Sequence, residues 1–168
     1  MATPIEVRVM EMLSAIEVPA NAAEQIGAMG TEAVTVVCEA ALGSYPGLRF
    51  KVRTNAASMV AKLDHPQAAE TLSLLINDAS ADIAVRALRG VARRHAAQYV
   101  PEIAKVLRLS STEPHAAAEA IQTLRSLGTP EARGVLEAYA SAAVEQVPHR
   151  GSPVVRKVLE TPLRPRTR

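Results

Sequence analysis

The chain contains four histidines and one cysteine, the residue types best suited to catalysis or metal binding near neutral pH. The histidines stand at positions 65, 95, 115 and 149. No two of them have the H-x-x-x-H or H-E-x-x-H spacing that puts two metal ligands on one helix face. No glycine-rich phosphate loop and no G-x-S-x-G turn occurs. We therefore expect no metal, no cofactor and no catalytic residue, and we expect that the protein is not an enzyme.

His65 and His115 stand at the starts of predicted helices, where a turn or capping role is expected. Cys38 lies among Val34, Val37 and Leu42, which predicts a core thiol and not a nucleophile. One cysteine excludes an intramolecular disulfide and fits a reducing compartment. The sequence contains no run of about 18 apolar residues, the length that would predict a membrane span. We expect a cytoplasmic protein that makes no contact with a membrane.

Arginine and lysine side chains could bind phosphate if they gathered on one face. The candidates for such a basic contact are Arg86, Arg89, Arg93, Arg156 and Lys157. The first three are three and four residues apart, so they share one side of a helix. Leu88 and Val91 must then face inward, which leaves these arginines on a solvated outer face. Because aromatic residues are only 2% of the chain, base stacking has few side chains to use, and nucleic-acid binding is not favoured.

Charge is distributed unevenly along the chain. Residues 148–168 carry a net charge of +5, and the other residues carry −3. Such a basic segment can touch an acidic partner, although a solvated chain end is the more common case. Ser152-Pro153 predicts the start of a short helix over 153–160 within it.

The stretch 48–78 shows the organisation of the rest of the chain. Two apolar stripes with helical spacing lie on either side of Asp64-His65-Pro66, where proline ends one helix and begins the next. The first stripe is Val52, Ala56, Met59, Val60 and Leu63, and the second is Ala69, Leu72, Leu75 and Ile76. Two short helices cannot bury these stripes against each other alone, so further copies must stack beside them.

The sequence repeats itself at an interval that supplies these copies. Leu63-Asp64-His65-Pro66 superposes on Leu127-Gly128-Thr129-Pro130 at an offset of 64, which is two units of 32. Val52-Arg53 superposes on Val85-Arg86 at an offset of 33. A period of 30 to 35 residues with two helices in each unit indicates an α-solenoid.

Residues 52–78 resemble a known family of repeats. Their pattern is Val-Arg, Ala-Ala, Leu-Asp-x-Pro-x-Ala and Leu-x-x-Leu-Leu-x-Asp, which is similar to the short HEAT repeats of the phycobilisome-lyase-like type. The resemblance implies an all-α fold, a right-handed solenoid (α-α superhelix) of stacked antiparallel helix pairs. About four pairs would occupy residues 1–147, and residues 148–168 would follow as a basic C-terminal segment.

The resemblance also implies roles for particular residues. Arg53 and Arg86 match arginines that pair with acidic groups in a ladder between units, and Asp82 and Asp78 are the available partners. The second helix of each pair would line the concave face, where partners usually dock. The predicted partner-binding residues on these helices are Gln67, Glu70, Thr71, Glu102, Lys105, Arg108, Glu131, Arg133 and Glu137.

These observations favour a non-enzymatic protein-interaction module, an adaptor or regulator that binds another protein through this face. Two alternatives stay open. One is a nucleic-acid-binding HEAT-like protein, and the other is an enzyme related to the bilin lyases, for which no catalytic residue can be named. The sequence does not specify the partner or the oligomeric state.

Overall fold

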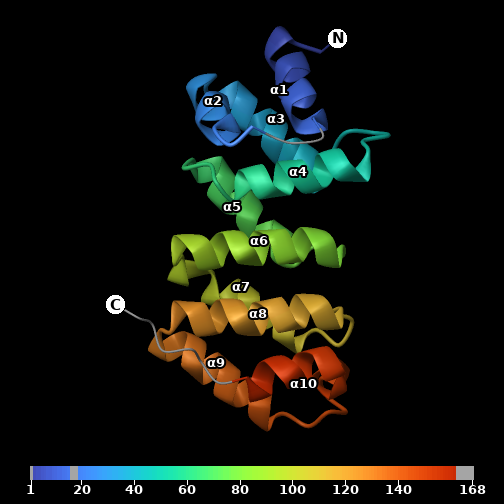
Figure 1. Cartoon of the computed structure of the whole chain (residues 1–168), viewed down its shortest axis with the longest axis vertical. Coiled ribbons are helices and arrows are strands. Elements are labelled where there is room, and N and C mark those ends of the chain that lie inside the picture. The colour runs from blue at the N-terminus through green and yellow to red at the C-terminus, as the bar shows by residue number, and fades with distance from the viewer. Residues whose placement is uncertain (1, 16–18, 162–168) are drawn as a thin grey trace. The chain divides into compact units, whose positions relative to one another are not determined.

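The computed structural model describes residues 2–15 and 19–161, and every regular element among them is helical (Figure 1). The all-α prediction is therefore confirmed. The chain divides into two compact units, Met1–Asp78 and Ala79–Arg168. The part of the predicted basic segment from residue 162 onward lies outside the described residues.

The first unit is organised around its third helix. Its helices are α1 (Pro4–Ser14), α2 (Ala22–Ala28), α3 (Thr31–Leu42), α4 (Phe50–Val60) and α5 (Pro66–Leu75). α3 packs against each of the other four, and α1 and α4 also touch. Seven of the twelve residues of α3 are buried, mostly alanine and valine, so the other helix backbones can approach it closely.

The second unit is organised in the same way around α8. Its elements are α6 (Ala81–Arg94), the 3₁₀ turn η1 (Ala97–Tyr99), α7 (Val100–Arg108), α8 (Pro114–Leu127), α9 (Pro130–Ser141), the 3₁₀ turn η2 (Pro148–Gly151) and α10 (Pro153–Glu160). α8 packs against α6, α7, α9 and α10. α10 occupies the range in which the sequence places a short helix.

Local signals explain where these helices begin and end. Thr3, Thr129 and Ser152 each accept a hydrogen bond from a backbone N–H of the first helical turn, and proline follows each of them directly. His65 does the same with its ring, because Nδ1 accepts from the backbone N–H of Gln67 at 3.2 Å. The capping role expected for His65 is thus confirmed. Gly128 ends α8 with a φ of 63°, a conformation that favours glycine.

Candidate functional site

The face formed by α7 and α9 holds an apolar groove in the second unit. Its volume is about 260 Å³. The lining residues are Ala104, Leu107 and Arg108 of α7, Val135, Ala138, Tyr139 and Ala142 at α9 and its C-terminal end, and Val147. These two helices are the second members of the predicted pairs, so the groove lies on the helices that the sequence assigned to partner binding.

A buried hydrogen bond fixes one wall of this groove. Tyr139 lines the groove, and its hydroxyl lies 2.9 Å from Nδ1 of His149. The two rings also stack, with 5.7 Å between their centroids and 11° between their planes. Burial raises the pKa of Tyr139 to about 12, so its hydroxyl keeps its proton at neutral pH. Two interlocked rings leave Tyr139 little freedom to change rotamer.

Burial also determines the charge of His149. Its side chain is 5% exposed, and desolvation lowers its pKa, with a smaller opposing effect from the backbone of Leu109. The imidazole is therefore neutral near pH 7. Sequence reasoning missed this histidine, because its partner is ten residues away and the contact depends on the turn η2.

The predicted partner-binding residues of the second unit are at the surface. Lys105, Arg108, Glu131, Arg133 and Glu137 are exposed, and Glu102 is half-buried. Arg108 alone among them lines the groove, and it makes no hydrogen bond or ion pair with any residue that the structure describes. Its charge is therefore available to a ligand.

The predicted residues of the first unit differ from expectation at one position. Thr71 is 4% exposed and shares a hydrogen bond with the buried Cys38, so it packs between α5 and α3 and cannot contact a partner. Gln67 is partly engaged as well, since its Oε1 accepts from the hydroxyl of Thr35 at 2.8 Å. Only Glu70 of this group is exposed. Threonine carries a methyl group and a hydroxyl, and the packing of α5 on α3 decided which way it faces.

Cys38 is the core thiol that the sequence predicts. It is 2% exposed, and desolvation raises its pKa above the usual value of 9.0. A thiol that is buried and protonated is a poor nucleophile.

The candidate basic residues do not form one free cationic face. Arg89 pairs with Glu119 through Nε at 3.0 Å, and the Nε of Arg93 donates to the backbone carbonyl of Arg89 at 3.2 Å. Arg86 is half-buried, whereas Arg156 and Lys157 are exposed on α10. The pair with Glu119 reduces the charge that α6 could offer to phosphate, which weighs against nucleic-acid binding.

Within the first unit, one arginine of the predicted ladder pairs with one of the two acids named as available to it. Arg53 pairs with Asp78, and its Nε also donates to the carbonyl of Ala41 at 3.0 Å. Asp82 is exposed in the first turn of α6 and is not the partner of Arg53. Arg53 therefore joins α4 to the C-terminal end of α3 and to the turn after α5.

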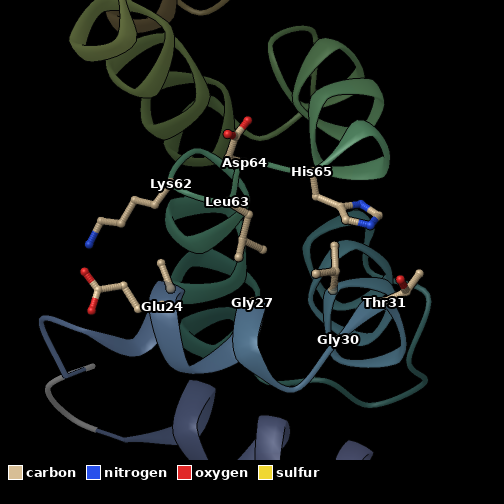
Figure 2. A pocket seen from close by; sticks show the side chains of 10 residues that line it. Glu24, Gly27, Gly30, Thr31, Lys62, Leu63, Asp64 and His65 are labelled. Atoms are coloured by element: carbon tan, nitrogen blue, oxygen red, sulfur yellow. The ribbon is translucent and has the colours of Figure 1, made fainter.

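A second, more polar cleft lies in the first unit, between the α2–α3 turn and the α4–α5 turn (Figure 2). Its volume is about 390 Å³. Figure 2 shows Glu24 and Lys62 extending to the same side, while Asp64 points away from the cleft. Both charge signs are present, and half of its ten lining residues belong to the two turns. We see no convergence of groups that would select one ligand.

No cluster of three or more histidine, cysteine or acidic residues that could hold a metal occurs in the described part of the chain. Among the same residues, no helix is both long enough and apolar enough to cross a bilayer. Comparison with protein-family models gave no match. A search of curated proteins gave no significant match either.

Proposed function

We propose that this protein is a cytoplasmic, non-enzymatic interaction module, an adaptor or regulator built as a HEAT-like solenoid, which binds a partner protein through its second helices. The observation that carries the proposal is the apolar groove between α7 and α9, bordered by exposed charged residues. An apolar centre with a polar rim is the usual composition of a protein-binding surface.

Contacts inside each unit support the solenoid part of the proposal. In the first unit Thr35 of α3 bonds Gln67 of α5, and in the second Arg89 of α6 bonds Glu119 of α8. The partners are 32 and 30 residues apart, which is one period of the sequence repeat. Side-chain contacts between equivalent helices at this interval are expected where helix pairs stack on their copies.

The charged residues of α7 and α9 support the binding part. Charged residues on an exposed helix face are common, so their presence alone indicates little. Here they border an apolar depression, and one wall of it is held rigid by the pair Tyr139 and His149. A preformed surface spends less free energy on ordering when it binds.

The experiment is affinity capture from native lysate with the wild-type protein and two variants. Ala138→Arg fills the groove with a charged side chain, and Gln122→Arg adds the same charge to an exposed position of α8. We expect a stoichiometric partner with the wild type and with Gln122→Arg, and loss of that partner with Ala138→Arg. A partner retained by Ala138→Arg, with thermal melting unchanged, would remove the groove from the proposed function.

A further inference from the structure

The size of the α7–α9 groove limits what can occupy it. Its volume of about 260 Å³ is below the range of about 300–1,000 Å³ that is typical of small-molecule and cofactor sites. Seven of its eight lining residues are apolar or aromatic. A pocket of this size and chemistry fits one large apolar side chain, the kind of anchor that dominates many protein interfaces.

The one charged lining residue, Arg108, gives the groove a positive charge. Arg108 is exposed at the C-terminal end of α7 and has no ionic partner among the described residues. Three other arginines are engaged: Arg53 with Asp78, Arg125 with the end of α10, and Arg150 with the carbonyl of Ala142. An unpaired guanidinium beside an apolar pocket favours a carboxylate on whatever enters.

The flanking charges extend this asymmetry along the groove. The C-terminal halves of α7 and α9 carry Lys105 and Arg108 against the single acid Glu137, a net charge of +1. Their N-terminal halves carry Glu102 and Glu131 against Arg133, a net charge of −1, so the C-terminal end of the groove is its basic end. Short turns join α7 to the start of α8 and the end of α8 to α9, so both helices run antiparallel to α8. The C-terminal ends of α7 and α9 therefore lie together, near the N-terminal end of α8. The apolar lining from Leu107 and Ala138 therefore lies toward the basic end.

Resting on the proposed function, we propose that this groove binds an amphipathic helix of a partner protein, with one apolar side chain between Leu107 and Ala138 and an aspartate or glutamate against Arg108. An apolar groove between helices is the surface on which amphipathic helices dock, with anchors at helical spacing. The pairing of charges fixes the direction and register of the helix, and it sets the preference for acidic partners.

The test begins with a displayed library of random 16-residue peptides selected against the full chain. We expect enrichment of peptides with apolar residues at i and i+4 and with at least one adjacent acidic residue. Synthetic, fluorescently labelled versions are then titrated by anisotropy against the wild type, Ala138→Arg, Arg108→Glu and the control Gln122→Arg. Circular dichroism melting of each variant checks folding.

We expect Ala138→Arg to weaken binding at least about tenfold and Gln122→Arg to leave it unchanged. Arg108→Glu should weaken acidic peptides about fivefold and strengthen analogues in which lysine replaces the acid. Groove-dependent binding of basic or uncharged peptides would overturn this inference and leave the proposed function standing. Selected peptides that bind Ala138→Arg as tightly as the wild type would also overturn this inference. The proposed function is then tested separately by the capture from lysate.

A second copy of the chain is the other candidate occupant. Sedimentation velocity over a hundredfold range of concentration tests it. Self-association that Ala138→Arg abolishes would overturn the inference, because the groove would then be an interface between copies.

Discussion

The guanidinium of Arg125 in α8 donates a hydrogen bond from Nη1 to the backbone carbonyl of Val158 in α10, at 2.6 Å. The same side chain donates to the carbonyls of Thr161 and Leu159, each at 2.8 Å. The last carbonyls of a helix have no partner within that helix, and a cation there also interacts favourably with the helix dipole. Arg125 therefore caps α10 and fastens it to α8.

Substitution of Arg125 should loosen α10 selectively. Lysine keeps the charge but cannot reach three carbonyls with one planar group. We expect Arg125→Lys to lower the free energy of unfolding by about 1 kcal/mol and Arg125→Met by about 2 kcal/mol. Hydrogen exchange should speed up first at the amides of 156–161. Arg133→Met, at an exposed position of α9, is the matched control. Equal protection of α10 in all four proteins would contradict this role.

Removal of α10 should promote self-association of the protein. Val155 is fully buried, while Arg156, Lys157 and Glu160 are exposed, so α10 turns an apolar side to α8 and a polar side to solvent. Without α10, the face of α8 that it contacts would be exposed to solvent, and an exposed apolar patch promotes association. A chain ending at Gly151 should therefore self-associate more than the full chain in sedimentation experiments at equal concentration. A sedimentation coefficient that stays at the value of the shortened monomer at every concentration would contradict this prediction.

Arg53 and Asp78 should contribute unequally to the stability of the first unit. Arg53 also bonds the carbonyl of Ala41, so Arg53→Met loses two interactions and leaves a partly buried carboxylate without this cation. We expect a loss of about 2 kcal/mol for Arg53→Met and about 1 kcal/mol for Asp78→Asn in urea unfolding. Lys51→Met, at an exposed position of α4, is the control. A larger loss from Asp78→Asn would show that the carboxylate, and not the arginine, organises this corner.

Acid should destabilise the second unit through His149. Its pKa is lowered by burial, so between that value and the usual value of about 6.5 the unfolded chain binds the proton that the folded chain excludes. Stability should therefore fall as the pH decreases below about 6.5. The hydroxyl of Tyr139 lies 2.9 Å from Nδ1 of His149, and it keeps its proton throughout this range because burial raises the pKa of Tyr139 to about 12.

The melting temperature at pH 7.5 and pH 5.0 measures this effect in the wild type and in His149→Gln. Glutamine does not titrate, so the melting temperature of His149→Gln should decrease less between the two pH values than that of the wild type. Equal decreases would assign the acid sensitivity to other groups.

The sequence by itself determined the helices and most of the core. Prolines, capping side chains and apolar residues at helical spacing act within a few neighbouring positions, so they can be recognised without any tertiary contact. Every residue of the two apolar stripes predicted within residues 48–78 is buried except Ala69, which is half-buried. Cys38 was also placed correctly, because its helical neighbours are apolar.

Only the tertiary structure decided which polar side chains meet. Thr71 faces inward, Arg89 meets Glu119, and Tyr139 meets His149, although helical spacing is compatible with several other arrangements. Each of these contacts depends on how one helix packs across another, which a period of three to four residues cannot specify. The same packing brought Leu107 and Ala138 to one groove and left Arg108 beside it without a partner, so the candidate site itself is a product of tertiary structure.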